Sequence, residues 1–225
     1  MKYELTGKPD FALAEVSLDD GEKLVAETGA MVAMSTNMQI ETKAKGGLLG
    51  GLKRMVTGES FFTNTFFPKG GPGTIKLAPS APGDIEAVEL NGGTYFMQAG
   101  AYIAHVGDIE IDAKFGGVRT FFSGEGLFLL KLTGRGTVFF GSYGGLKKVT
   151  VNGAYIVDTT HIVAFPETIT FNVQPVGGMK ATFLSGEGLV CRYTGQGDIY
   201  IQTRSAPAFG HWVNPFRPVK QKSNN

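Results

Sequence analysis

Three glutamates stand in a recurring glycine-rich motif and are the side chains best placed to form a site. Glu59, Glu125 and Glu187 each follow a glycine, in Gly-Glu-Ser, Gly-Glu-Gly and Gly-Glu-Gly. A carboxylate in such a turn can accept hydrogen bonds from backbone N–H groups of its own loop, and we favour this structural role. If the three carboxylates instead converged, their repulsion would require a bound cation or raised pKa values. The sequence leaves both interpretations open.

The three histidines and the single cysteine are the other side chains able to act in catalysis or bind a metal. A nucleophile needs a base and an orienting group beside it, and no Gly-x-Ser-x-Gly or Cys-plus-His signature accompanies His105, His161 or His211. We expect His161 to be an ordinary strand residue. A zinc site on Cys191 would need three further ligands. The sequence therefore predicts no enzymatic activity, no metal and no cofactor.

The glycine-rich stretches lack the remaining parts of a phosphate site. Residues 46–53 contain glycines and a lysine but no Gly-Lys-Ser/Thr. Thr-Gly-Arg-Gly at 133–136 and Thr-Gly-Gln-Gly at 194–197 lack the third glycine of a dinucleotide motif, and we expect them to be hairpin turns. With 21 basic and 20 acidic residues the net charge is +1, which disfavours nucleic acid as a partner.

The elements that must carry these side chains are predicted to be β-strands. Apolar and polar residues alternate at 109–112, 169–174 and 199–202, as in strands with one buried face. Many of the 33 glycines form pairs between such runs, where glycine allows the positive φ of tight turns. A hydrophobic content of 42% is enough for a packed core. The sequence therefore predicts an all-β fold, with a short helix or apolar loop at 48–56.

Two types of segment each occur three times, in the same order. The first type has three apolar residues, an acid or amide, a small pair, and then apolar residues ending in alanine; it covers residues 24–33, 95–104 and 155–164. The second type begins with Gly-Glu and covers residues 58–62, 124–128 and 186–190. Such internal similarity is typical of repeated structural units.

We therefore predict three tandem β repeats, near residues 20–80, 90–145 and 150–204, within a single all-β domain over residues 1–204. Units this short would be marginally stable alone, so they should share a core around a pseudo-threefold axis as a β-sandwich or barrel-like scaffold. Two sets of residues should occupy equivalent positions: Gly58, Gly124 and Gly186 in turns, and Ala33, Ala104 and Ala164 in strands.

The same motifs resemble a known family. They are Phe-Ser-Gly-Glu-Gly-Leu at 122–127, Val-Asp-Thr-Thr-His-Ile-Val-Ala-Phe at 157–165, Leu-Ser-Gly-Glu-Gly-Leu at 184–189, Gln-Thr-Arg at 202–204 and Thr-Gly-Glu-Ser-Phe-Phe at 57–62. In combination they are similar to the altered-inheritance-of-mitochondria family, also called mitochondrial biogenesis proteins, in its prokaryotic form, formerly a domain of unknown function. The resemblance covers nearly the whole chain.

This resemblance implies a fold similar to the tryptophan RNA-binding attenuator protein, repeated within one chain and without an established enzymatic activity. The chain departs from the mitochondrial members because its start lacks a targeting leader. A single cysteine cannot form an intrachain disulfide. We therefore expect a cytoplasmic protein.

An apolar insert near residues 46–57 has no counterpart in the other repeats. Its apolar residues are Leu48, Leu49, Leu52, Met55 and Val56. An exposed patch of this kind usually marks an association surface, and we predict a homo-oligomer contact. Because Lys53 and Arg54 stand beside the patch, peripheral contact with a membrane surface is the alternative.

Residues 205–225 are predicted to be a C-terminal docking arm. Pro207, Pro215 and Pro218 oppose a helix, so the arm should be an extended strip. Its aromatic residues, the candidate interface side chains, are Phe209, Trp212 and Phe216. We expect them to pack into grooves on the β-core or on a neighbouring subunit.

Taken together, these features favour a non-enzymatic oligomeric scaffold or protein-association module, forming a homo-oligomer and binding an unidentified protein partner. The alternative, by analogy with the attenuator-like fold, is an RNA-binding or small-ligand-binding protein.

Overall fold

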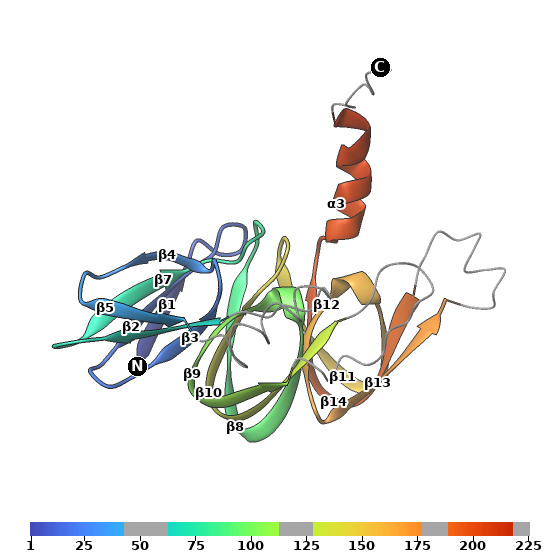
Figure 1. Ribbon diagram of the computed structural model, residues 1–225. Helices are drawn as coiled ribbons and strands as arrows, with labels where there is room; N and C mark the ends of the chain where they lie inside the picture. Colours follow the sequence, from blue (N-terminus) through green and yellow to red (C-terminus); the bar gives the residue numbers. More distant parts are fainter. Residues whose placement is uncertain (43–62, 113–127, 177–188, 218–225) are drawn as a thin grey trace, which may run out of the picture.

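The chain folds into antiparallel β-sheets with a helix at its C-terminal end (Figure 1). The computed structural model describes residues 1–42, 63–112, 128–176 and 189–217. In this part of the chain the strands follow one another with short turns, and the described α-helix is α3 (Ala206–Val213). The predicted all-β class is confirmed.

The strands form two sheets. The 4-stranded sheet has the order β1 (Lys2–Thr6), β2 (Leu13–Leu18), β7 (Gly73–Leu77), β4 (Met31–Met34). The 10-stranded sheet has the order β11 (Leu146–Asp158), β14 (Leu189–Gln202), β12 (Ile162–Pro166), β8 (Ile85–Gln98), β10 (Leu129–Gly141), β9 (Tyr102–Asp112), β3 (Leu24–Glu27), β6 (Thr63–Pro68), β5 (Met38–Thr42), with β13 (Ile169–Pro175) on β14. Short 3₁₀ turns, η1 (Ala99–Ala101) and η2 (Thr159–His161), precede β9 and β12.

The same order of strand pairing recurs along the chain. In the first segment, residues 13–77, β6 and β7 pair with β2 and β3 on one side and with β4 and β5 on the other. In the second segment, residues 85–141, β10 lies between β8 and β9. In the third segment, residues 146–202, β14 lies between β11 and the pair β12 and β13. Figure 1 shows the three segments side by side, in blue, green and orange.

A register shift occurs at a matching place in each segment. Met31 pairs with Leu77 and Ala33 with Lys76; Tyr102 pairs with Phe140 and Ala104 with Phe139; Ile162 pairs with Ile201 and Ala164 with Tyr200. In each case one residue is passed over in the pairing: Val32 on β4, Ile103 on β9 and Val163 on β12. Such a bulge bends the strand locally. The three alanines predicted to be equivalent therefore all follow the same irregularity. The glycines at 58, 124 and 186 lie outside the described residues.

Two further pairings join the segments edge to edge. β3 of the first segment pairs with β9 of the second, and β8 of the second pairs with β12 of the third. The hydrophobic core follows these junctions, since its clusters contain residues of neighbouring segments. Ile103 and Phe139 pack with first-segment side chains, and Val163 packs with second-segment side chains. The segments therefore do not have separate hydrophobic cores.

The glycine motifs at 133–136 and 194–197 are not hairpin turns, contrary to the prediction. They lie inside the long strands β10 and β14. At Gly134, whose φ is +130°, a Cβ atom would stand 2.0 Å from the carbonyl oxygen of Asp108 on β9. Glycine is required there because the neighbouring backbone approaches too closely for a side chain.

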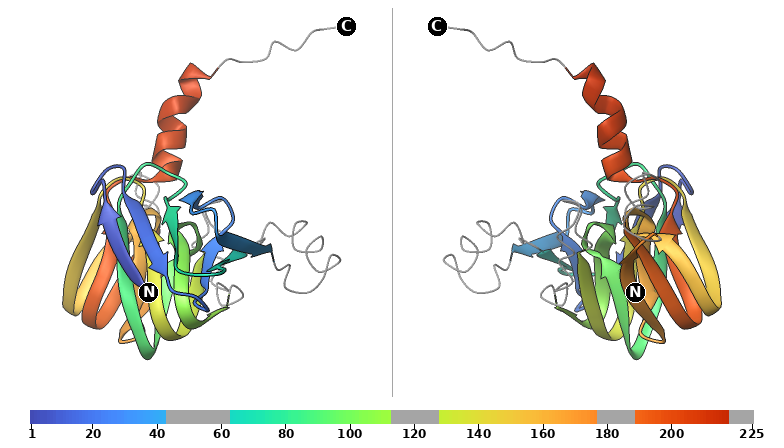
Figure 2. Two further views of the ribbon diagram at one scale, coloured as in Figure 1. Left: turned by 90° about the vertical axis from the view of Figure 1, so that its left-hand side faces the viewer. Right: turned by 90° about the vertical axis from the view of Figure 1, so that its right-hand side faces the viewer.

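The C-terminal segment is helical over α3, so the prediction of an extended strip is wrong. Ser205 begins the helix by accepting a hydrogen bond from the N–H of Ala208 at 3.4 Å. Pro207 lies in the first turn, where its missing N–H costs no intrahelical bond. A serine cap followed by proline is a sequence signal for a helix start that the proline count obscured. Figure 2 shows α3 standing away from the sheets.

Among the described residues, no helix is both long enough and apolar enough to cross a membrane.

Candidate interaction surface

The predicted glutamate site lies outside the described residues. Glu59, Glu125 and Glu187 fall in the ranges 43–62, 113–127 and 177–188. The apolar insert residues Leu48, Leu49, Leu52, Met55 and Val56 also fall in the first of these ranges. Both predictions therefore remain predictions.

The acid or amide within each first-type segment ends a strand, β3, β8 or β11, and has a structural role where its contacts are described. Asp158 begins η2, and its Oδ1 accepts hydrogen bonds from the N–H of Thr160 at 2.8 Å and from its hydroxyl at 2.6 Å. Gln98 begins η1 with the same backbone angles, φ −59° and ψ 135°. Glu27 is partly buried, and this burial raises the pKa of its carboxyl group.

His105 belongs to a buried hydrogen-bonded group at the junction of β3 and β9. The hydroxyl of Tyr102 donates to the carbonyl of Val25 at 3.0 Å and lies 2.8 Å from Nδ1 of His105. Because the only hydroxyl proton goes to Val25, Nδ1 of His105 must carry a proton and donate to the tyrosine oxygen. Burial, and next the nearby Glu27, raise the pKa of Tyr102 well above its usual value. These hydrogen bonds stabilise the pairing of β9 with β3.

Hydrogen bonding and burial in the fold account for His161 and Cys191, although His161 lies in the 3₁₀ turn η2 and not in a strand as predicted. Nδ1 of His161 lies 2.7 Å from the backbone oxygen of Gln202, which can only accept, so this nitrogen is the donor. Cys191 is buried, and burial raises the pKa of its thiol to about 11. Within the residues that the structure describes, no group of three or more His, Cys, Asp or Glu side chains is arranged to hold a metal ion.

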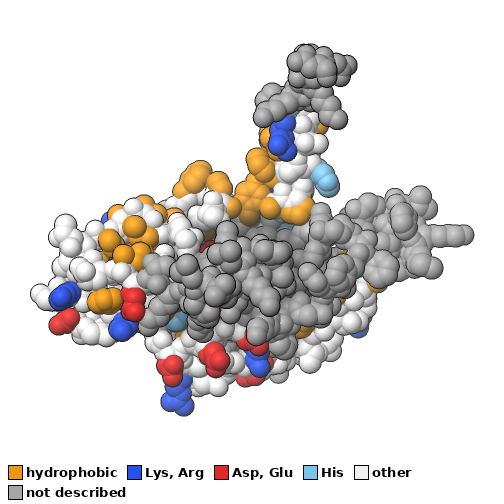
Figure 3. Space-filling model, in the orientation of Figure 1, with side chains coloured by type: hydrophobic (Ala, Val, Ile, Leu, Met, Phe, Trp, Pro, Cys, Tyr) orange, Lys and Arg blue, Asp and Glu red, His pale blue; other side chains and the backbone are white. Residues whose placement is uncertain are grey.

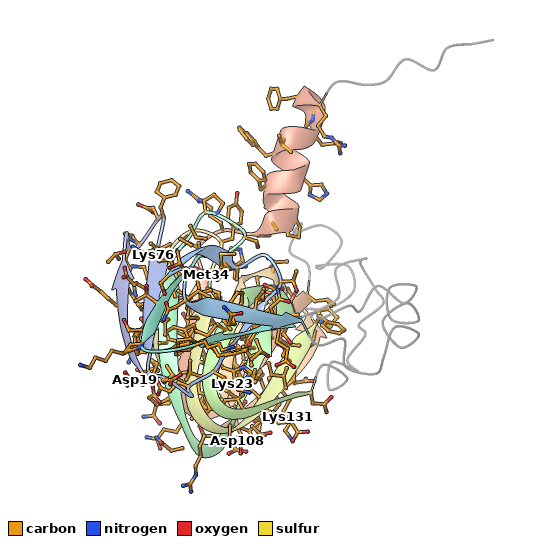
Figure 4. All side chains as sticks on the ribbon, turned by 60° about the vertical axis from the view of Figure 1, so that its left-hand side comes forward. Asp19, Lys23, Met34, Lys76, Asp108 and Lys131 are labelled. Carbon is orange, nitrogen blue, oxygen red and sulfur yellow. The ribbon has the colours of Figure 1, made fainter. Side chains whose placement is uncertain are left out.

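Exposed apolar side chains gather on the two strands that end the row of segments. On β4 they are Met31, Val32 and Met34, with exposed fractions of 38%, 57% and 38%. On β11 they are Tyr155 and Ile156, at 42% and 54%. Figure 4 marks Met34 on the outer strand, and Figure 3 shows hydrophobic side chains over that end of the molecule. These residues were not singled out from the sequence as exposed, because alternation cannot show whether a neighbouring strand covers them.

Helix α3 carries a second apolar surface. Phe209, Trp212 and Phe216 are exposed to 48%, 65% and 73%, and their ring centroids follow one another at 5.8 Å and 5.8 Å. Their spacing places them on one face of the helix and the 3₁₀ turn η3 (Asn214–Phe216) that follows it. Phe209 meets Tyr143 edge to face at 6.0 Å at the foot of the helix. The expectation that all three rings enter grooves on the chain's own β-core is therefore wrong, and contact with a neighbouring subunit stays a prediction.

This architecture defines a class of protein: an all-β protein whose segments are joined through antiparallel edges, with apolar side chains at both ends of the row. The family model described as mitochondrial biogenesis AIM24 matches residues 3–204. The chain belongs to this family, as the motif resemblance predicted. The match ends just before α3.

Two Streptococcus pyogenes proteins are similar to the chain over nearly its whole length. An uncharacterised protein of serotype M6 is 31% identical over 229 residues, covering 97% of this chain and 92% of that protein. A second protein, solved by X-ray crystallography as a structural-genomics target, is 30% identical with a TM-score of 0.78, covering 96% of this chain and 99% of that one.

Proposed function

We propose that the protein is a self-associating β-scaffold that holds other proteins and carries out no catalytic step. The observation that carries this proposal is the concentration of exposed apolar side chains on β4, β11 and α3. Apolar groups gathered on edge strands and on a projecting helix are costly in water, and such surfaces usually mark association sites.

The scaffold is proposed to consist of three repeats of one unit, with the attenuator-like fold that the family resemblance implies. The two junctions join the segments in a row rather than around the pseudo-threefold axis expected from the sequence. Support comes from the recurring pairing order and from the register shift before Ala33, Ala104 and Ala164. Superposing the segments 13–77, 85–141 and 146–202 tests the repeat, because unrelated positions for these alanines would contradict it.

Helix α3 is proposed as the surface for a protein partner. Its aromatic face stands clear of the sheets, and aromatic side chains supply much of the binding energy at protein interfaces. The test is capture from a lysate of the native host with the wild-type chain and with a Trp212→Ala, Phe216→Ala variant. We expect a discrete partner only with the wild-type chain, and equal capture by both would contradict this role of α3.

Self-association is tested by light scattering over a range of concentrations at low and high salt. An apolar association should give a mass above that of one chain that does not fall as salt is raised. Retention on an RNA matrix that weakens with salt would instead support the RNA-binding alternative. A single-chain mass at every concentration would refute self-association.

A further inference from the structure

The two junctions inside the chain have the same register. In the first junction, Ala26 of β3 stands opposite Ala104 of β9. In the second, Met97 of β8 stands opposite Ala164 of β12. Ala26 and Met97 each precede the acid or amide of their segment, and Ala104 and Ala164 each follow the register shift. Both pairings are antiparallel, so one rule of assembly is used twice.

These two junctions leave one strand without a neighbouring segment in the first segment and one in the third. The first segment contributes its β3 to a junction, but its β4 pairs with β7 alone among the described strands. The third segment contributes its β12, but its β11 pairs with β14 alone among them. Figure 1 shows β4 in the first segment and β11 in the third, with the second segment between them, and the two strands do not pair with each other among the described strands.

Burial distinguishes β4, which has no neighbouring segment beside it, from β9 and β12, which pair with one. Val32 on β4 is 57% exposed, whereas the residues passed over at the same place in the other segments, Ile103 and Val163, are 2% and 0% exposed. Two positions further on, Met34 is 38% exposed, whereas its counterparts His105 and Phe165 are buried. The apolar character of β4 therefore suits a covered strand.

Charge also marks which part of β11 is open to pairing. Natural edge strands are commonly protected by lysine, and the first half of β11 carries Lys147 and Lys148. The second half, with Tyr155, Ile156 and Val157, carries no charge before Asp158. This uncharged part is the counterpart of Tyr95, Phe96 and Met97 on β8, which are paired with β12.

We propose that β11 of one chain pairs antiparallel with β4 of a second copy, in the register of the two internal junctions. Val157 then stands opposite Ala33 of the next copy, and Ile156 stands opposite Met34. The proposal rests on the proposed self-association and specifies its surface. Because the two edges differ, the contact is head to tail, and copies join into a closed ring or a filament.

The first test is a disulfide between two separately prepared variants, Met34→Cys and Ile156→Cys. Residues directly opposite on antiparallel strands have Cα atoms about 4.5–5.5 Å apart, which suits a disulfide. Under mild oxidation we expect the mixture to give a cross-linked pair that neither variant forms alone. Ile40→Cys replaces Met34→Cys in the control, because Ile40 is 50% exposed on β5 and lies outside the proposed pairing.

The second test uses charge. Met34→Lys and Ile156→Glu each place a charge in the apolar contact, and each variant alone should associate at least about tenfold more weakly than the wild-type chain. Mixing the two gives alternating copies, in which lysine faces glutamate at one junction and Met34 faces Ile156 at the next, and should restore the assembly of the wild-type chain. Both side chains are exposed in the single chain, so an unchanged melting temperature of each variant in dilute solution confirms that folding is intact.

The outcomes separate this proposal from the one on which it rests. If the wild-type chain forms an oligomer but the cysteine pair does not cross-link and the charged variants keep the same mass, the head-to-tail junction is wrong and self-association stands. If the wild-type chain has the mass of one chain at every concentration, both proposals are overturned.

Discussion

The hydroxyl of Tyr102 shows how a single polar group can fix the relation of two segments. It is buried between β3 and β9, donates to the carbonyl of Val25 and accepts from His105. The free energy of such a bond matters less than the cost of leaving buried partners without it. Buried polar residues such as Tyr102 determine how β3 and β9 pair. The side chains that the sequence first suggests for catalysis contribute less to this pairing.

Replacing Tyr102 with phenylalanine should lower the free energy of unfolding by about 1–3 kcal/mol, because the Val25 carbonyl and the His105 ring each lose this buried bond. Urea unfolding measures the change. Tyr3→Phe is the matched control, since Tyr3 is 44% exposed and keeps its ring contact with Phe139. It should stay within about 0.5 kcal/mol of the wild type. Equal effects of both substitutions would show that the buried bonds do not matter.

The thiol of Cys191 should react slowly in the folded chain. Burial raises its pKa to about 11, so at pH 8 only about one molecule in a thousand carries the reactive thiolate. Labelling with a chromogenic disulfide should accelerate as pH rises towards that value, and should be fast at pH 8 in denaturant. The exposed thiol of Ile156→Cys serves as the control. Rapid labelling of native wild-type protein at pH 8 would disprove this environment.

At the scale of the elements, close backbone approach decides where glycine is needed. β9 and β10 come so near that the Gly134 Cβ position is occupied by the Asp108 carbonyl. Elsewhere glycine is replaceable: at Gly100 in η1 no atom lies within 4 Å of an added Cβ, and no positive φ is imposed. The sequence does not distinguish the two positions, since Gly100 follows the small residue Ala99 and Gly134 follows the polar residue Thr133.

Gly134→Ala should therefore destabilise the chain by more than about 3 kcal/mol or prevent folding, because both the steric overlap and the φ of +130° oppose a side chain. Gly100→Ala should stay within about 1 kcal/mol of the wild type. Thermal unfolding of the two variants gives the comparison. A Gly134→Ala chain as stable as Gly100→Ala would mean that the strands separate at no cost.

At the scale of the whole molecule, the clusters of the core cross the junctions, so the segments depend on one another. Ile103 belongs to the second segment but packs in the cluster of the first, and Val163 of the third packs in the cluster of the second. A chain linked in this way should unfold as one cooperative unit rather than segment by segment.

Ile103→Ala tests this dependence. Ile103 is 2% exposed, so its truncation should lower the free energy of unfolding by about 2–5 kcal/mol. Hydrogen exchange should accelerate by the same factor in β2 and β7 of the first segment as in β10 of the second. Ile40→Ala, at a half-exposed site on β5, should change exchange little. Acceleration confined to the second segment would mean that the segments unfold independently.

The sequence by itself determined the β class and the family. Alternation with a period of two is a local signal, and it directly reports strands with one buried face. The recurring sequence segments also singled out Ala33, Ala104 and Ala164, each of which follows a register shift in the strand pairing. The glutamates in the second type of segment were found in the same way, but their surroundings lie outside the described residues.

Only the tertiary structure decided which glycines lie inside strands and which apolar strands stay uncovered. Gly134 is required by a strand that comes from another part of the chain, so no local pattern could separate it from a turn glycine. Val32 and Val163 lie in similar segments, yet one is exposed and the other buried, because only the second has a neighbouring segment to cover it. Burial is a property of pairing across the sheet, and pairing is non-local.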